Sequence, residues 1–195
     1  MRLVQGVGIN DAGYKVARRV EGVQFICPYY RKWANMLKRA YSQKYKLAHP
    51  SYSGARVCTG WLTFSVFKEW MEQQDWEGKE LDKDVIKPGN KEYGPEVCCF
   101  ITGALNKLLT YSSATRGAHP MGVLRSKDTG RFNAACCVDG KTKSLGGFET
   151  QEEASLAYRV FKANLIREAG LVQVDTRIAR GLEAHATLME EGHYG

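Results

Sequence analysis

The sequence lacks the features that place a chain in a membrane or outside the cell. No apolar run approaches the ~18 residues of a membrane-spanning helix, so we expect no membrane partner. The first residues lack the charged-then-apolar layout of a secretory signal, which favours a cytoplasmic protein. Apolar residues make up 44% of the chain and charged residues 25%, the balance of a globular protein.

Cysteine is present, but not in the spacing that binds zinc. Four of the six cysteines form vicinal pairs at 98–99 and 136–137, and neither Cys27 nor Cys58 has a C-x-x-C partner. This argues against the usual pattern of a zinc site. In a cytoplasmic protein we expect such thiols to be reduced and mostly buried.

Acidic residues are scarce in the first 50 residues, where only Asp11 and Glu21 stand against ten lysines and arginines. The whole chain carries a formal net charge of +7. A basic N-terminal third is an electrostatic footprint for a polyanion, most often nucleic acid. The alternative is a solvated basic face without a partner.

The C-terminal third has the pattern of a small sheet closed by a helix. Three strand-like segments at 122–127, 130–138 and 141–148 are separated by turn signals and followed by a helical pattern at 151–169. A sheet of three strands needs a covering helix to be stable. Its free face would be a basic ribbon of the kind that fits the major groove of DNA. We expect this face to carry Arg125, Lys127, Arg131, Asn133, Lys141 and Lys143.

The predicted helix after this sheet has start and stop signals of its own. Thr150 is an N-cap candidate, and Glu153 occupies the capping-box position three residues later. Apolar residues from Ala154 to Leu165 recur at helical spacing, and Gly170 is expected to end the helix. Asp175 is expected to cap a second helix in the tail, which packs on the core or on a second subunit.

The motifs of this region resemble a known DNA-binding domain. The order GV, TGRF-x-A, K-x-LG-x-F-x-T-x-EEA-x-x-AY is similar to the plant ethylene-response-factor (APETALA-type) domain, especially the versions fused to phage HNH endonucleases. The resemblance covers roughly residues 116–170 and implies double-stranded DNA as the partner. The alternative is a small sheet-and-helix module whose lysines only solvate one face.

Two further helices are predicted in the first 76 residues. From Tyr29 to Tyr41 the apolar residues fall on one face, and Pro28 fits the first turn. Aromatic residues at intervals of three from Trp61 to Trp70 predict a second helix, with its tryptophans in the core rather than stacked on a ligand. The polar side of the first helix offers candidate phosphate contacts, namely Arg31, Lys32, Lys38 and Arg39.

Between these regions the chain predicts a strand, a loop, a second strand and a helix. The strands are expected at 80–85 and 97–101, with a turn at 88–90 and a helix that begins after Thr102 and contains Asn106. This is the layout of the ββα-metal element of HNH nucleases. Carboxylate and amide oxygens placed in this way hold a hard cation, which stabilises the leaving oxygen when a phosphodiester breaks.

A second resemblance, to phage HNH homing endonucleases, covers nearly the whole chain. It rests on GVGIND, W-x-x-F-x-x-F, LDKD, GNK-x-Y-x-PE and C-x-F. It implies that Asp82, Asp84 and Asn106 bind Mg²⁺ or another divalent cation, and that Asp82, Lys83 and Asn106 form the catalytic set. Lys83 stands where the family has its catalytic His, and Val97 stands at the family's middle Asn.

These two departures weaken the expectation of an active nuclease. A lysine keeps its proton at neutral pH unless it is desolvated, so Lys83 makes a poor general base. Val97 cannot form the hydrogen bonds by which an amide fixes a loop. None of the four histidines lies in the motif, although His49 could approach it in space. The alternative is that residues 82–84 form only an exposed charged strand.

Together these patterns predict an α+β protein with a degenerate HNH core followed by a three-stranded antiparallel sheet and a helix. The expected parts are residues 1–112, 116–170 and a helical tail at 171–195. We expect a phage-type DNA-binding protein of the host-cell cytoplasm, with or without nuclease activity. The alternatives are an inactive DNA-binding regulator and an inhibitor that binds a host protein. The sequence leaves the target DNA, any host partner and the oligomeric state open.

Overall fold

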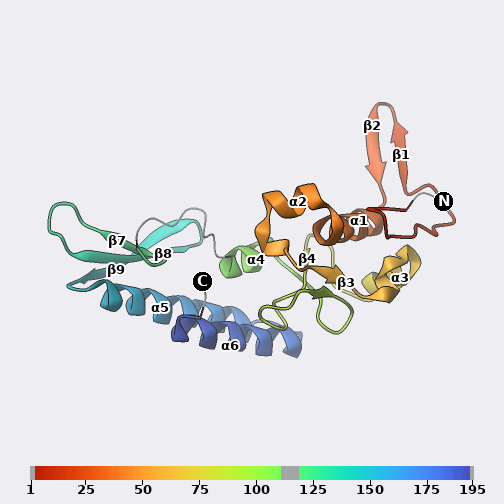
Figure 1. The fold of residues 1–195 in the computed structure, drawn as a ribbon. Coiled ribbons are helices and arrows are strands. Elements are labelled where there is room, and N and C mark those ends of the chain that lie inside the picture. The colour runs from red at the N-terminus through yellow and green to blue at the C-terminus, as the bar shows by residue number, and fades with distance from the viewer. Residues whose placement is uncertain (1–2, 111–118, 194–195) are drawn as a thin grey trace. The chain divides into compact units, whose positions relative to one another are not determined.

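The computed structural model describes residues 3–110 and 119–193, which form a mixed α+β chain with small sheets (Figure 1). The chain divides into two compact units, Met1–Asn106 and Lys107–Gly195. The boundary expected between residues 112 and 116 lies outside the described residues. No helix in the described part is long and apolar enough to cross a membrane.

The core of the first unit is built around two helices, α1 (Pro28–Tyr41) and α3 (Phe64–Glu72). Both predicted helices are therefore confirmed, with Pro28 in the first turn of α1. Trp33 is fully buried, and its indole Nε1 donates a hydrogen bond of 2.7 Å to the backbone oxygen of Trp61. The middle-third aromatics thus serve mainly as core.

Gly8 belongs to the same core because only glycine fits there. A Cβ at this position would lie 2.3 Å from Leu37 Cδ1 and 2.9 Å from the Trp33 ring. Real Cβ atoms do not approach other atoms so closely, so any side chain at Gly8 would displace the core of α1. The N-terminal segment is thereby held against the helix that carries the basic residues.

Short elements complete the first unit. The N-terminal segment contains a two-stranded antiparallel hairpin and two isolated bridges, Val4–Gly8 and Ile9–Thr63. A second pair of strands is parallel. These elements are β1 (Ala17–Val20), β2 (Val23–Ile26), α2 (Gln43–Ala48), β3 (Arg56–Val57), β5 (Glu92–Tyr93) and two 3-10 turns, η1 (Pro50–Tyr52) and η2 (Thr59–Leu62).

The expected strand, loop, strand and helix are present as β4 (Glu80–Asp82), β6 (Cys99–Ile101) and α4 (Gly103–Leu109). The two strands are antiparallel, with Asp82 opposite Cys99. Each strand is shorter than predicted. The first ends at Asp82 because its side chain accepts hydrogen bonds from the next turn, and so takes the chain out of the sheet.

The second unit contains the predicted three-stranded antiparallel sheet, β7 (Val123–Arg125), β8 (Phe132–Val138) and β9 (Lys141–Phe148), with α5 (Gln151–Leu171) against it. The predicted capping box is confirmed. Thr150 accepts a hydrogen bond from the Glu153 N–H, and Glu153 accepts one from the Thr150 N–H.

The predicted end of α5 at Gly170 is wrong. The helix continues to Leu171, and Gly170 lies buried against α6 (Thr176–Glu191), where an added Cβ would lie 3.6 Å from Leu182 Cβ. This is an ordinary van der Waals distance, so Gly170 is a packed residue within the helix and does not end it. Asp175 caps α6 as predicted, by accepting a hydrogen bond of 2.9 Å from the Arg177 N–H.

Candidate functional site

The acidic residue Asp82 lies at the end of β4 in a largely buried position. Its Oδ1 accepts hydrogen bonds of 2.8 Å from the backbone N–H groups of Asp84 and Val85. Burial, together with the charge of Asp84, raises the pKa of Asp82 to about 6. A buried carboxyl with a raised pKa beside a second carboxylate is typical of functional sites, although structural charge networks also produce it.

Lys83, at the position where the resemblance places a general base, is a buried structural residue. Its side chain is 5% exposed, and Nζ donates hydrogen bonds of 2.9 Å to Asp84 Oδ2 and to the backbone oxygen of Asn90. Lys83 therefore ties the strand end to the following loop, and both contacts give it a structural role.

Asn90 fixes this loop from the other side. Its Nδ2 donates hydrogen bonds of 2.6 Å to the backbone oxygen of Lys83 and 2.7 Å to that of Glu92, while Oδ1 accepts one of 3.2 Å from the Glu92 N–H. Sequence reasoning placed the loop-fixing amide at Val97 and found it missing. The turn signal at 88–90 and the GNK motif both include Asn90, but neither revealed these contacts.

Asn106, expected to meet Asp82, instead donates a hydrogen bond from Nδ2 to Glu80 Oε2. Glu80 and Asp82 are two residues apart on β4, so their side chains lie on the same side of the strand. The structure thus joins the helix to the strand through Glu80, a residue that sequence reasoning missed. The alternation of acidic residues along 80–84 was the available signal.

Two cations of α1 lie beside this strand. Lys32 Nζ donates to the backbone oxygen of Lys79, and Arg39 Nη1 donates a hydrogen bond of 3.4 Å to that of Leu81. Burial lowers the pKa of Lys32, against the opposing effect of the Glu80 charge. Both residues, expected to contact phosphate, therefore support β4 as well.

His49 is connected to the same region through aromatic rings. Its ring centroid lies 4.3 Å from that of Tyr45, and Tyr45 lies 5.6 Å from Tyr52. Burial raises the pKa of Tyr52; the nearby Arg39 opposes this, and the charges of Asp84 and Asp82 add to it. His49 is therefore connected through the Tyr45 ring to Tyr52, whose pKa is affected by the charges of Asp84 and Asp82.

The described residues do not fit a resident metal site well. Among them no group of three His, Cys, Asp or Glu side chains gathers in a way that could hold a metal ion. Two of the oxygens expected to bind it already have partners: Asp82 Oδ1 accepts two backbone N–H groups and Asp84 Oδ2 accepts a hydrogen bond from the Lys83 ammonium. Lys83 thus supplies a cation to Asp84 from within the chain.

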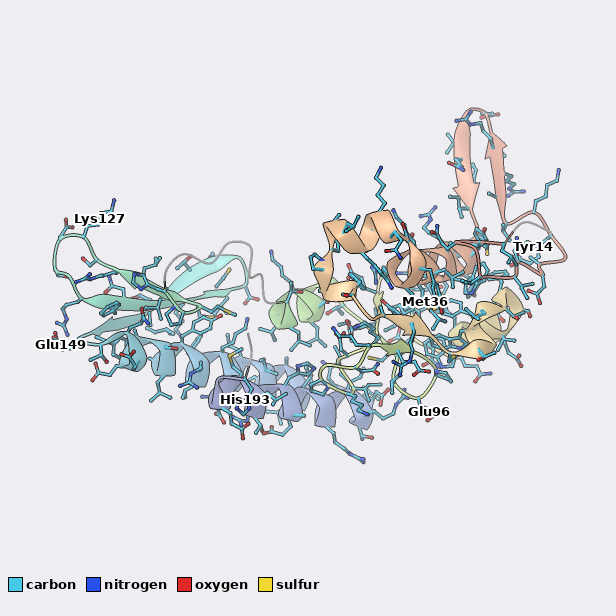
Figure 2. The ribbon with its side chains drawn as sticks, viewed as in Figure 1. Tyr14, Met36, Glu96, Lys127, Glu149 and His193 are labelled. Carbon is cyan, nitrogen blue, oxygen red and sulfur yellow. The ribbon has the colours of Figure 1, made fainter. Side chains whose placement is uncertain are left out.

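The sheet of the second unit places only part of the expected basic ribbon on its free face. Arg131 and Asn133 alternate with the buried Ala134 and Cys136, so they point away from α5. Arg131 Nη2 donates a hydrogen bond of 3.3 Å to the Gly147 oxygen and lies 3.0 Å from Glu149 Oε1. Lys127 lies in the exposed β7–β8 turn (Figure 2).

Lys141 and Lys143 were expected on this free face, and that expectation is wrong. The two-residue turn pairs Lys141 with Val138 and Lys143 with the buried Cys136, and residues opposite each other share a face. Lys143 Nζ accordingly lies 4.8 Å from the centroid of the Phe161 ring on α5. Both lysines are exposed, but on the helix side.

Arg125 also lies on the helix side of the sheet. It pairs with Phe132, whose ring centroid lies 5.7 Å from its guanidinium carbon, and its Nε donates a hydrogen bond of 3.1 Å to the Gly130 oxygen. The exposed residue that faces outward on β7 is Leu124, opposite Asn133. The free face is thus less basic than expected.

The cations of α1 divide into two sets. Arg31 and Lys38 are exposed, whereas Lys32 and Arg39 are turned towards β4. Lys38 Nζ lies 5.3 Å from the centroid of the Tyr45 ring.

Comparison of the chain with protein-family models, curated proteins and solved structures finds no match.

Proposed function

We propose that the protein binds double-stranded DNA through phosphate contacts made by its N-terminal unit. The observation that carries this proposal is the charge of residues 22–68, which contain eight lysines and arginines and no acidic residue. Arg31, Lys38 and Lys44 of this stretch are exposed on α1 and α2. Arg56 and Lys68 are paired with Glu92 and Glu72, so it is the exposed cations of α1 and α2 that would attract the DNA backbone and displace its counterions.

The second unit supports the proposal with a further set of exposed polar and basic side chains. Lys127, Arg131 and Asn133 are exposed at one end of the sheet, where an arginine and an asparagine have the donors needed to read guanine and adenine edges. This end of the sheet would contact the bases, and the cations of α1 would contact the phosphates. Half or more of protein–DNA hydrogen bonds go to phosphate and sugar, which position the protein without specifying sequence.

The acidic residues favour a second candidate function, divalent-cation-dependent cleavage of the bound DNA. Its specific support is Asp82, a buried carboxyl whose pKa is raised to about 6 and which shares one side of β4 with Glu80. A divalent cation near such a pair would neutralise it and favour both charges. Because Lys83 is committed to structural hydrogen bonds, we rank a binding protein without cleavage first.

One experiment separates the two candidates. Purified protein is mixed with supercoiled plasmid in Mg²⁺, Mn²⁺ or EDTA, and binding and strand breaks are read on the same gel. Retarded but intact plasmid in all three conditions supports the binding protein. Nicked or linear plasmid that requires a metal and disappears in an Asp82→Ala variant establishes cleavage, and plasmid that is neither retarded nor cut contradicts both functions.

A further inference from the structure

The β1–β2 hairpin has no role in the core of its unit. It extends away from α1 and α3 (Figure 1), and every residue of β1 and all but the last of β2 are exposed. Its base is held by a hydrogen bond of 2.8 Å from the Cys27 N–H to the Val16 oxygen. Because its side chains are exposed, the hairpin gains little packing from the rest of the unit, and a two-stranded hairpin alone is only marginally stable in water.

The turn of the hairpin is built for a tight ribbon. Glu21 and Gly22 both have positive φ, 49° and 81°, and they connect strands in which Val20 pairs with Val23. Two consecutive residues with positive φ form the turn whose twist matches that of the adjoining strands. The segment is thus a defined ribbon with fixed faces.

The register gives the hairpin one apolar face. Arg18 lies opposite Phe25 and Val20 lies opposite Val23, so these four side chains share a face. Val20, Val23 and Phe25 are 45%, 57% and 51% exposed. Three large apolar side chains left in water on one small ribbon indicate a surface that a partner covers.

The charge of the hairpin indicates what that partner is. Lys15, Arg18 and Arg19 are exposed, and Glu21 at the tip is the only acidic residue of the segment 12–27. Arg19 pairs with Gln24 on the face opposite to the apolar one, so the ribbon presents an arginine on each face. An arginine on both sides suits a ligand that surrounds the ribbon with negative charge.

We propose that the β1–β2 hairpin inserts into the major groove of duplex DNA. Strands of four residues reach about 13 Å, and the major groove, about 12 Å wide and 8.5 Å deep, admits a two-stranded ribbon. Arg18 and Arg19 contact the two walls of the groove, and the apolar face packs against thymine methyl groups. The inference rests on the proposed DNA binding and adds a contact element to it.

The test measures the affinity of the full chain for a fluorescent 30-base-pair duplex by anisotropy. The double variant Arg18→Gln with Arg19→Gln is expected to bind roughly tenfold or more weakly than wild type. The control, Lys87→Gln with Arg180→Gln, removes the same charge from exposed positions elsewhere and should bind within about twofold of wild type. Circular dichroism and tryptophan fluorescence confirm that both variants are folded.

A second measurement locates the hairpin on the DNA. A photo-crosslinking residue, p-benzoylphenylalanine, replaces Phe25 in one variant and the exposed Leu156 of α5 in another. We expect a stronger DNA crosslink from position 25 than from position 156. The crosslink from position 25 should be lost when the major-groove ligand methyl green is added. It should persist when the minor-groove ligand netropsin is added. A crosslink removed only by netropsin overturns the assigned groove.

The outcomes separate this inference from the function on which it rests. Wild-type protein that does not bind the duplex overturns both. Wild-type protein that binds, with a hairpin variant equal to its control and no crosslink from position 25, overturns the hairpin contact alone and leaves phosphate binding by α1 in place. That result would assign the apolar ribbon to a protein partner.

Discussion

The charged form of Asp82 is disfavoured in the folded protein, because the carboxyl is largely buried and lies beside Asp84. Its pKa is raised from 3.8 to about 6, so the folded state binds the proton more tightly than the unfolded chain. The stability from this group is fully present below about pH 4 and is lost as the pH rises through about 6. At neutral pH the charged carboxylate therefore destabilises the first unit.

We expect Asp82→Asn to raise the free energy of unfolding at pH 7.5 by roughly 2–3 kcal/mol and to change it little at pH 4. The amide oxygen still accepts the two backbone hydrogen bonds of Oδ1. Urea unfolding followed by tryptophan fluorescence measures this, since all four tryptophans lie in the first unit. Glu77→Gln, at an exposed position, controls for the change of net charge.

Lys83→His tests whether the buried lysine stands in for a catalytic base. The imidazole is too short to replace both hydrogen bonds of Nζ, to Asp84 and to the Asn90 oxygen. We expect a loss of about 1–3 kcal/mol in stability and no cleavage of plasmid DNA in Mg²⁺ or Mn²⁺. Lys87→His, at an exposed position, is the stability control. A folded Lys83→His variant that cuts DNA would revive the nuclease hypothesis.

At the scale of elements, α1 is the main phosphate-binding element of this account. Arg31→Gln with Lys38→Gln removes its two exposed cations while leaving Lys32 and Arg39 against β4. We expect roughly tenfold weaker binding to every duplex tested, because phosphate contacts carry no sequence information. The comparison is made by anisotropy on several unrelated duplexes, and a loss confined to one of them would contradict the assignment.

The exposed end of the β7–β8–β9 sheet is expected to act differently. If Arg131 reads a base, Arg131→Gln should weaken binding to a preferred duplex by about 1–3 kcal/mol and affect unrelated duplexes little. The preferred duplex is obtained by selection from a random pool. Lys143→Gln is the matched control, since Lys143 lies on the helix side against Phe161. Equal losses from the two variants would mean that the face is not used for readout.

Local signals made some of these elements predictable from the sequence. Thr150 and Glu153 form their capping box within four residues, and Asp175 caps the next helix in the same way, so each could be recognised where it stands. The end of α5 was missed because Gly170 continues the helix and packs against Leu182, a contact that the local sequence does not reveal. A glycine at a helix end and a glycine between helices look alike in a sequence.

At the scale of the whole molecule, the α+β content was predictable, but the faces and partners were not. The faces of Lys141 and Lys143 depend on the pairing register of β8 and β9, which periodicity within one strand does not give. The hydrogen bonds of Asn90 to Lys83 and of Asn106 to Glu80 cross 7 and 26 residues. Such contacts decide the chemistry of the acidic site, and they become visible only in the folded chain.

The central claim, duplex binding through exposed cations, is tested most directly by the salt dependence of the affinity. The logarithm of the association constant should fall linearly with the logarithm of the salt concentration, and its slope should correspond to several displaced counterions. In the Arg31→Gln, Lys38→Gln variant this slope should be smaller by about two phosphate contacts, or roughly 1.8. An affinity that does not change with salt, or a variant with the wild-type slope, would contradict the account.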